Sequence, residues 1–402
     1  MKKQLSIFMA CAFLMTHDIN AQNPIIQNIL NDVRIDSLTK FVNELSGQKL
    51  GSINGVSDTI HSRHKDSPDN EKAFQYINQK FADFGLQVDT LQFSSTGKNI
   101  VAILPGTLYP GKKYIIGAHY DNMPPFPNFL SAPGADDNAS GVAAVLEAAR
   151  IFSQYSFPFT INFALWDEEE QGLIGSSAWV GNAGSNNDSL LAYINMDMIG
   201  WDGNNDSVAE IHTRPIAQSV QLANVSLNCN SLYNIDLGII RIVNLGITAS
   251  DHASFWNYNY TAITIEEDIQ NDFNPYYHTQ GDTLGHFNLS FYEKVTKLAF
   301  ATIASLAIDT NQILEINSNE NEFADMVNFF PNPTSGKFQV YNNILSSSSL
   351  VLEIRNYLGI KVFSTPITNS GMMIDFAFQP KGIYFVSIFD GEKVMTKKLV
   401  IQ

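Results

Sequence analysis

The sequence has 402 residues, of which 45% are hydrophobic and 16% are charged, so the chain can bury a sizeable core and is long enough for two ordered domains. Its formal net charge is -16 at pH 7. This charge argues against nucleic acid and against anionic membrane surfaces as partners, because both repel an acidic protein.

Residues 1–21 have the pattern of a secretory signal peptide, with two lysines, an apolar run at residues 5–15, and Ala21 as a small residue at a cleavage site. The run is too short to span a bilayer, and no other stretch is long enough. We therefore expect no membrane span, and a secreted or cell-surface protein exported through the periplasm. Removal of the signal would leave Cys229 alone, which excludes an intramolecular disulfide.

Helices and strands alternate along the next part of the chain. Helical spacing predicts helices at residues 23–46, 67–84, 142–152, from about 172, and 290–307. Short apolar runs predict strands at residues 86–93, 99–104, 113–118, 159–166, 192–196 and 262–265. The pattern is less regular between residues 198 and 250. This alternation predicts an α/β fold, in which a mixed, mainly parallel sheet lies between helices.

The chain changes character after a polar stretch at residues 311–325, which has the composition of a linker. Short strands with Gly and Asn turns follow at residues 338–341, 350–355, 362–363, 383–389 and 395–401. They predict a small all-β sandwich at residues 326–402, after an α/β domain at residues 22–310.

An unusual acidic run follows the buried strand predicted at residues 159–166. It consists of Asp167, Glu168, Glu169 and Glu170. Crowded carboxylates resist desolvation, so such a run is either a solvated turn or a site that binds a cation. The run alone favours the solvated turn.

Other potential ligands also follow predicted strands or begin a helix: His119, Asp121, Asp136, Asp137, Asp197 and His278. Each has an ordinary explanation by itself, such as a core histidine or a helix N-cap. The carboxyl ends of parallel strands, however, meet at one edge of a sheet. Their joint placement therefore favours a common site.

Two histidines and three carboxylates suit a pair of zinc ions, which accept imidazole and carboxylate ligands and can share a carboxylate at a separation of about 3.5–4 Å. One further carboxylate is then free to act as a general base. The adjacent pair Glu169 and Glu170 suits this division of roles. Asp121, two residues after His119, is placed to orient its ring.

Residues about 60–307 resemble the secreted co-catalytic zinc aminopeptidases, the family of bacterial leucyl aminopeptidase. Six motifs carry the resemblance: GAHYD (117–121), APGADDNASG (132–141), EEQGLIGS (169–176), NMDM (195–198), SDHASF (250–255) and YHTQGDT (277–283). The resemblance implies an enzyme that hydrolyses the N-terminal residue from peptides with a free N-terminus and holds two Zn²⁺ per chain.

The resemblance also implies a role for each ligand. Asp137 would bridge the two ions, His119 and Asp197 would complete one site, and Glu170 and His278 would complete the other. Glu169 would be the general base that takes a proton from the bridging hydroxide or water and passes it to the leaving amine. The peptide bond between Asp137 and Asn138 would be cis. Asp136 and Glu168 receive no role, and we expect them to be solvated or structural, whereas we expect Asp167 to add little beyond local charge.

The expected substrate pocket is apolar, with Trp201, Ile247 and Tyr277 as wall residues and Met198 packed beneath a ligand. Glu266 and Gln270 stand where the leucine-specific relatives have phenylalanines. They suggest a more polar pocket that accepts basic or polar first residues. The alternative is that both face solvent.

The last 75 or so residues resemble the sorting domain of type IX secretion, through FPNPTSG (330–336), GIYFV (382–386) and KKLV (397–400). This resemblance implies the outer-membrane secretion machinery as a partner. The sandwich could instead bind carbohydrate or another surface.

Two other functions remain open for the whole chain. One is a glutaminyl-cyclase-like acyltransferase with a single zinc on the same fold, and the complete ligand set, including His119, argues against it. The other is a non-catalytic surface protein, against which Glu169 beside the ligands argues. No extra domain separates His119 from Asp137, which favours an aminopeptidase over the larger carboxypeptidases.

Overall fold

The computed structural model describes residues 22–124, 131–186, 188–309, 327–342, 350–356, 360–367, 372–390 and 393–402. The chain divides into two units, Met1–Leu314 and Glu315–Gln402. The predicted signal peptide at residues 1–21 and the predicted linker at residues 311–325 lie outside the described residues.

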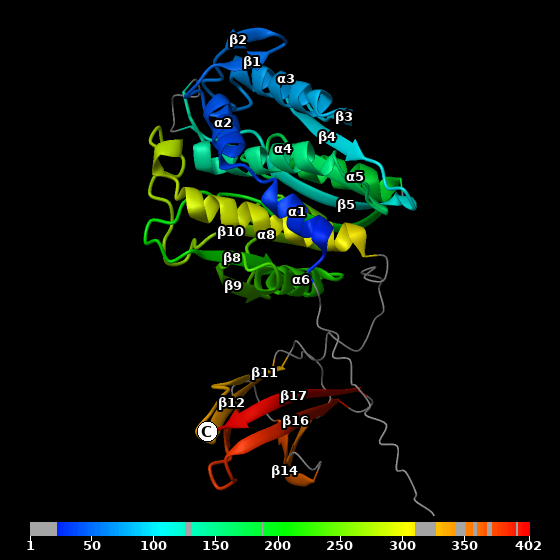
Figure 1. Cartoon of the computed structure of the whole chain (residues 1–402), viewed down its shortest axis with the longest axis vertical. Helices are drawn as coiled ribbons and strands as arrows, with labels where there is room; N and C mark the ends of the chain where they lie inside the picture. Colours follow the sequence, from blue (N-terminus) through cyan, green and yellow to red (C-terminus); the bar gives the residue numbers. More distant parts are fainter. Residues whose placement is uncertain are drawn as a thin grey trace, which may run out of the picture. The chain divides into compact units, whose positions relative to one another are not determined.

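An eight-stranded sheet with the strand order β3-β4-β6-β5-β7-β10-β8-β9 forms the centre of the larger unit (Figure 1). The four middle strands β6, β5, β7 and β10 are parallel, and antiparallel pairs lie toward both edges. The bounds are β3 Gln87–Gln92, β4 Lys98–Leu104, β5 Tyr109–His119, β6 Phe159–Trp166, β7 Ser189–Met196, β8 Val208–Thr213, β9 Gly238–Val243 and β10 Ala262–Glu267. A separate hairpin consists of β1 Gly51–Ile53 and β2 Val56–Asp58. The predicted mainly parallel α/β sheet is confirmed.

Helices cover both faces of this sheet, because side chains of a strand alternate between two buried faces. In β5, Tyr114 and Ile116 belong to the main core beneath α4 and α8, whereas Ile115 packs with α5 and α7 on the other face. The helices are α1 Pro24–Asn31, α2 Ile35–Leu45, α3 Pro68–Asp83, α4 Gly141–Phe152, α5 Ile174–Ser185, α6 Ser219–Leu232, α7 His252–Asn257 and α8 Leu289–Ile308. Two short helical turns are η1 Ala135–Ser140 and η2 Leu284–His286.

The prediction of a single helix at residues 23–46 is wrong in one respect, because the chain forms two helices there, α1 and α2. Arg34 between them has extended backbone angles, and its N–H donates to the buried carboxylate of Glu147 at 3.0 Å. A backbone N–H used in this way cannot continue the helical ladder. The prediction for α3 is confirmed, and Gly85, with φ of 76°, follows its end.

The region of irregular pattern, residues 198–250, contains three regular elements, β8, α6 and β9. The sequence did not predict them. In α6 the polar positions are mostly serine and asparagine, which also favour turns, so the helical periodicity is weakly marked.

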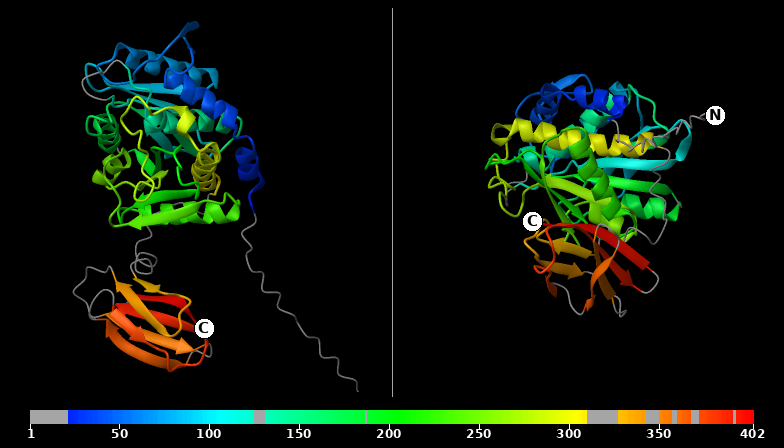
Figure 2. Two further views of the ribbon diagram at one scale, coloured as in Figure 1. Left: turned by 90° about the vertical axis from the view of Figure 1, so that its left-hand side faces the viewer. Right: turned by 60° about the horizontal axis from the view of Figure 1, so that its bottom comes forward.

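The smaller unit is a β-sandwich with a core of its own, drawn from both sheets (Figure 2). One sheet has the order β11-β12-β15 and the other β14-β13-β16-β17. The bounds are β11 Val327–Phe330, β12 Lys337–Asn342, β13 Leu350–Asn356, β14 Lys361–Ile367, β15 Met372–Asp375, β16 Gly382–Asp390 and β17 Lys393–Ile401. The predicted all-β class is confirmed, although β11 and β15 were not predicted. In the part of the chain that the structure describes, no helix is both long and apolar enough to cross a membrane.

Candidate metal centre

The carboxyl ends of β5, β6 and β7 bring the predicted ligands together. His119 is the last residue of β5, and Asp197 directly follows β7, its neighbour in the sheet. Glu169 and Glu170 follow β6 on the other side of β5. Asp137 comes from η1, which leads into α4. The order of the strands in the sheet thus explains why residues distant in sequence meet.

Asp137 lies between the two histidines. Its Oδ1 is 3.3 Å from Nε2 of His119, and its Oδ2 is 3.0 Å from Nε2 of His278. Nε2 of His119 is also 3.3 Å from Oδ1 of Asp197, and Nε2 of His278 is 3.1 Å from Oε2 of Glu170. Each oxygen of Asp137 therefore belongs to a different set of donor atoms.

These distances fit two metal ions of the size of zinc. Ligand atoms at about 2.0 Å from a tetrahedral ion lie about 3.3 Å from each other. His119, Asp137 and Glu170 offer donor atoms within 4.8 Å of one another, and so do His119, Glu169 and Asp197. Oε1 of Glu170 is buried without a hydrogen-bond partner. Buried polar atoms without partners are costly, and a cation would satisfy them.

The segment that carries Asp137 is fixed from outside. The backbone N–H groups of Asp136 and Asp137 both donate to the carboxylate of Asp282, at 2.8 and 3.1 Å. Gly134, at the start of the segment, has φ of 51°, and a Cβ there would meet the carbonyl oxygen of Asp137 at 2.5 Å. The peptide bond between Asp137 and Asn138 is cis, as the resemblance implied.

Arg63 joins three parts of the chain around the site. Its fully buried guanidinium donates to the carbonyl oxygens of Tyr120, Leu45, Pro133 and Gly134 at 2.7–2.9 Å. Tyr120 follows His119, and Gly134 precedes Asp137, so the contacts link β5 to the segment before η1. Arg63 is the only arginine or lysine that is fully buried among the described residues. Burial lowers its pKa to about 10, although the nearby carboxylates act in the opposite direction.

Asp167, Glu168 and Glu169 of the acidic run are buried and Glu170 is half-buried, which corrects the expectation that Asp167 adds little beyond local charge. For Glu168 the structural alternative holds. The carboxylate of Asp167 accepts hydrogen bonds from Asn70 Nδ2 at 3.0 Å and from Tyr120 Oη at 2.8 Å. Glu168 accepts from the hydroxyls of Ser94 and Thr96. Hydrogen-bond donors, rather than solvent, therefore satisfy the first two acids of the run.

Asp136 is also buried and has structural contacts. Its carboxylate accepts from the N–H of Gly200 and the side-chain amide of Asn274, both at 2.8 Å. Of the two alternatives for Asp136, solvated or structural, the structural one holds.

Asp121 connects His119 with the acidic run. Its carboxylate accepts from the N–H groups of Glu169 and Glu170 at 3.1 and 3.2 Å. Nδ1 of His119 lies 3.2 Å from the carbonyl oxygen of Asp121 and 3.5 Å from its Oδ1. These contacts can hold the tautomer in which Nε2 of His119 faces the other ligands.

Proton affinities at this edge of the sheet follow from burial and crowding. Burial raises the pKa of Glu169 well above its usual value, and it raises the pKa of Glu170 to about 7. Although burial opposes it, hydrogen bonds to the two carboxylates raise the pKa of His278 to about 10. Hydrogen bonds from both histidines hold the pKa of Asp137 below its usual range, although burial acts in the other direction. Burial and crowding thus favour protons on these carboxylates, and a bound cation would displace such protons.

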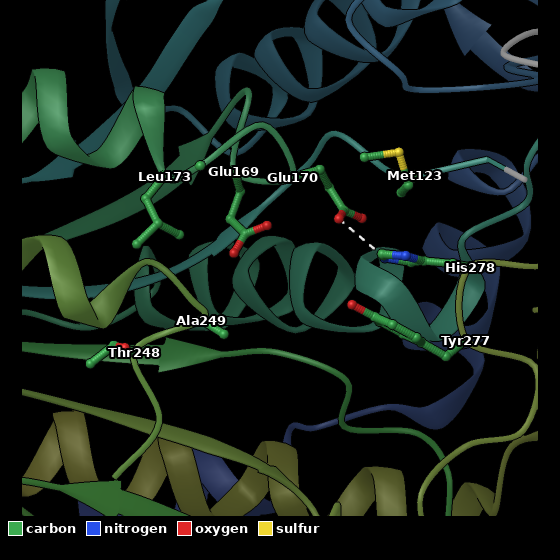
Figure 3. Close-up of a pocket in the computed structure, with 9 residues that line it drawn as sticks. Met123, Glu169, Glu170, Leu173, Thr248, Ala249, Tyr277 and His278 are labelled. Carbon is green, nitrogen blue, oxygen red and sulfur yellow. Dashed lines mark ion pairs between the residues drawn. The ribbon is translucent and has the colours of Figure 1, made fainter. Parts of the chain in front are cut away.

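A pocket of about 510 Å³ opens beside these carboxylates (Figure 3). Its lining includes Met123, Glu169, Glu170, Gly172, Leu173, Thr248, Ala249, Tyr277 and His278. The hydroxyl of Tyr277 points into the pocket toward the two glutamates, and its ring stacks on His278 at 3.7 Å. The pocket therefore adjoins the predicted ligands, of which Glu170 and His278 line it.

The predicted substrate residues take up different positions. Tyr277 lines the pocket, and Ile247 directly precedes the lining residue Thr248. Met198 is buried, and Trp201 is half-buried. Glu266 is buried 3.1 Å from Nε2 of His212, and Gln270 is exposed. The lining given above contains neither Glu266 nor Gln270, and the alternative that both face solvent is wrong for Glu266.

Four residues around the site were not predicted to have a part in it: Arg63, Asp167, Asp251 and Asp282. Asp251 is fully buried, and neither of its carboxylate oxygens has a hydrogen-bond partner. Its position in the SDHASF motif was the one signal that could have found it. Arg63 stands in no motif that carried the resemblance.

The fold and the site define a mixed α/β protein with a cluster of histidines and carboxylates, a candidate metal centre, at the carboxyl edge of its sheet. The sequence profile described as Peptidase family M28 matches residues 99–303, half of the chain. The chain therefore belongs to peptidase family M28. Residues 328–402 match the secretion system C-terminal sorting domain. Both predicted resemblances are confirmed.

Individual relatives agree with this assignment. Leucine aminopeptidase 1 of Paracoccidioides brasiliensis (strain Pb18) is 28% identical over 249 residues, which are 59% of this chain and 63% of the relative. The chain thus spans less than two thirds of that relative's length.

Solved structures support the fold. The LapA aminopeptidase of Legionella pneumophila has a TM-score of 0.60 and 21% identity, and the match covers 71% of this chain and 75% of LapA. Glutaminyl cyclase of Bacteroides thetaiotaomicron has a TM-score of 0.55 and 20% identity, and covers 67% of this chain and 97% of its own. Proteins of different activity thus share this fold, and activity has to be argued from the site.

Proposed function

We propose that this chain is a secreted metallo-aminopeptidase that removes the first residue from peptides with a free N-terminus and uses two Zn²⁺ ions. The observation that carries the proposal is the position of Asp137, whose two oxygens lie 3.3 and 3.0 Å from the Nε2 atoms of two different histidines. A carboxylate that faces two sets of donor atoms is suited to bridge a metal pair. Membership of peptidase family M28 supports the same reaction class.

Five side chains would hold the ions: His119 and Asp197 in one site, Glu170 and His278 in the other, and Asp137 in both. When bound, the pair supplies Lewis acidity, which polarises the scissile carbonyl and makes water a better nucleophile at neutral pH. The residues of the chain position the substrate and move the proton.

Glu169 is the proposed general base. It is 7% exposed and lines the pocket beside the proposed ligand Glu170. It would take a proton from the attacking water and donate it to the nitrogen of the leaving amine. Tyr277, whose hydroxyl points toward Glu169 and Glu170, is placed to donate a hydrogen bond to the substrate carbonyl as it gains negative charge.

The pocket would take the first residue of the peptide. Its volume of about 510 Å³ is sufficient for one large side chain and the adjoining peptide group. The leucine aminopeptidase relative supports an apolar first residue. The predicted preference for basic or polar residues would need Glu266 to reach the substrate from its buried position.

Export follows from the C-terminal sorting domain. We propose that residues 326–402 direct the chain to an outer-membrane secretion machinery, after a signal peptide at residues 1–21 has taken it into the periplasm. The match of residues 328–402 to the sorting-domain profile supports this route.

The second candidate is a single-zinc acyltransferase that cyclises N-terminal glutamine, as glutaminyl cyclase does. The structural likeness to that enzyme favours it. The Asp137 geometry argues against it, because a carboxylate shared between two histidines is superfluous for a single ion.

One experiment separates these functions. The purified chain is incubated with the same peptide carrying a free or an acetylated N-terminus, with and without a chelator, and with zinc restored. We expect cleavage of the free peptide alone, its loss with chelator and its return with about two zinc ions per chain. Cleavage that ignores acetylation would refute the exopeptidase function, and release of pyroglutamate from a glutaminyl peptide at one zinc per chain would favour the cyclase.

A further inference from the structure

The segment that connects β9 to α7, residues 244–251, forms one wall of the pocket. Thr248 and Ala249 line the pocket and are exposed. Leu245, two residues before Ile247, is 83% exposed. A short exposed segment of this kind adopts one conformation only where its backbone N–H and C=O groups form hydrogen bonds. The partners of Gly246 and Ile247 are therefore decisive for the shape of the wall.

Three basic side chains from two other elements hold these two residues. The N–H of Ile247 donates to Nδ1 of His212 at 3.2 Å, and its carbonyl oxygen accepts from Nε2 of His252 at 2.9 Å. The carbonyl oxygen of Gly246 accepts from Nε and Nη2 of Arg214 at 3.0 and 2.6 Å. His212 lies on β8, Arg214 directly follows β8, and His252 is the first residue of α7. We call these three residues the backbone clamp.

The contacts determine the proton positions on both histidines. Ile247 offers N–H to His212, so Nδ1 of His212 has a free lone pair and Nε2 carries the proton. That proton is directed to Oε2 of Glu210, 2.7 Å away. His252 must carry its proton on Nε2, because a carbonyl oxygen can only accept. Burial lowers the pKa of His252 to about 3, so its imidazole is neutral at any working pH.

The same proton positions exclude another role for this cluster. His212, Glu210 and Glu266 together could be taken for an additional metal site, because Glu210 and Glu266 each have an oxygen without a hydrogen-bond partner. Nε2 of His212 is protonated, however, and a protonated nitrogen cannot bind a metal. Glu210 thus serves to fix the tautomer of His212.

Packing reinforces the clamp. A Cβ added to Gly246 would meet the carbonyl oxygen of Thr213 at 2.8 Å, so the segment lies directly on the end of β8. The ring of His252 contacts that of Trp256 at 4.5 Å, and the guanidinium of Arg214 lies 5.3 Å from the Trp256 ring. Trp256 therefore holds Arg214 and His252 in place, and Glu210 holds His212.

The other end of the wall is tied to the metal centre. The hydroxyl of Ser250 donates to Oδ2 of the proposed ligand Asp197 at 2.6 Å. Thr248 and Ala249 thus lie between a fixed point at Ile247 and a fixed point at Ser250. The position of the pocket wall relative to the metals depends on both.

We propose that His212, Arg214 and His252 are positioning residues that fix the pocket wall at residues 246–249 and thereby set the affinity for the first residue of the substrate. This inference rests on the proposed aminopeptidase function. The clamp touches neither the pocket nor the proposed base, so its loss should raise KM and leave kcat nearly unchanged.

The two histidines allow a crossed test, because the amide of asparagine can occupy the place of Nδ1 and that of glutamine the place of Nε2. His212→Asn keeps an acceptor for the N–H of Ile247 and loses the donor to Glu210. His212→Gln does the reverse. At the other position, His252→Gln keeps the donor to the carbonyl of Ile247, and His252→Asn loses it.

Two measurements are made on the zinc-loaded full-length protein and these four variants. The first is KM and kcat on leucyl and lysyl anilides. The second is hydrogen–deuterium exchange of a peptide that contains residues 244–250. We expect His212→Gln and His252→Asn to raise KM about tenfold, with kcat within about twofold, and to speed exchange in this peptide. His212→Asn and His252→Gln should match the wild type in both.

The thermal midpoint separates positioning from general stability. His212→Asn leaves Glu210 buried without its donor, so it should melt at a lower temperature than His212→Gln and yet have the lower KM. Equal changes of KM within each pair, or a KM that follows the melting temperature, would overturn the proposal. If the wild type cleaves no peptide, the proposed function fails, and the exchange data alone decide: a crossed pattern supports the clamp, and equal exchange within each pair refutes it.

Discussion

Glu169 and Glu170 are adjacent in sequence and serve different parts of the site. Glu170 lies 3.1 Å from His278, whereas Glu169 belongs to the donor set of His119 and Asp197 and lines the pocket. The backbone N–H groups of both are held by the carboxylate of Asp121. A single carboxylate thus fixes the direction of two side chains with different proposed tasks.

Replacement of Glu169 by glutamine should separate these tasks. The amide keeps the size of the side chain and cannot take a proton, so we expect kcat to fall by about 10³-fold while zinc content stays near two per chain. Glu170→Gln is the matched control, and it should lose zinc. The measurement is kcat together with metal analysis of the same samples. A Glu169→Gln variant as active as the wild type would remove Glu169 from the mechanism.

Arg63 should contribute both to stability and to metal binding. Arg63→Met removes a donor from four carbonyl oxygens, of which that of Gly134 keeps the N–H of Ala139, and each buried oxygen left unpaired costs about 1–3 kcal/mol. We expect a loss of several kcal/mol in urea unfolding and weaker zinc binding, because Gly134 and Tyr120 flank the ligand segments. Arg63→Lys keeps the charge and makes fewer of the contacts, so its stability and zinc affinity should lie between those of the wild type and those of Arg63→Met. If only the charge mattered, Arg63→Lys would equal the wild type.

Most of the proposed ligands could be predicted from the sequence because they end or follow a strand, or begin a helix beside one, and strand ends converge. His119 and Asp197 were found at strand ends and Asp137 at the start of a helix. Arg63 and His212 could not be, because they act through backbone groups of other segments. Such contacts leave no spacing pattern, since the acceptor can be any residue. Asp167 was misjudged for a related reason: its partners Asn70 and Tyr120 lie far away in sequence.

At the scale of elements, many carboxylates near the carboxyl ends of β5, β6 and β7 are buried away from solvent. Burial raises the pKa of Asp251 to about 7 and that of Asp282 to about 8, from 3.8 in each case. With Glu170 and His278, these groups bind more protons in the folded metal-free chain than in the unfolded chain between about pH 4 and 8. The stability of the metal-free protein must therefore fall as the pH rises through this window.

This argument predicts a pH dependence that metal removes. The chelated protein should melt at a higher temperature at pH 6 than at pH 8, whereas the zinc-loaded protein should change much less, because the ions replace the protons. Calorimetry of both forms in matched buffers checks this. An equal or opposite pH trend in the chelated protein would contradict it.

Elements with a strong periodic pattern were predicted, and those without one were not. α8 and β6 are nearly continuous apolar segments in the core, and both were found. α6 was missed because tertiary contacts with α8, rather than its own pattern, stabilise it. The break between α1 and α2 depends on Glu147, more than a hundred residues away, which no local pattern can indicate.

At the scale of the whole molecule, each unit has a hydrophobic core of its own. Each should therefore fold and unfold independently. A variant that ends at Leu314 should keep kcat/KM within about twofold of the full chain and lose export from cells. The measurements are the kinetics of the purified variant and its distribution between cells and medium. Loss of activity on truncation would show that the sandwich supports catalysis.

The place of Asp137 between two histidines has a further consequence. His119 and His278 are 159 positions apart, and the acid between them comes from a third segment. Ions held there would act as cross-links that close long loops of the chain, the task that disulfides perform in many exported proteins. Cys229, the cysteine in the described part of the chain, is free and buried. If the proposed ions are bound, the lifetime of the exported protein should therefore follow the supply of zinc rather than the redox state of its surroundings.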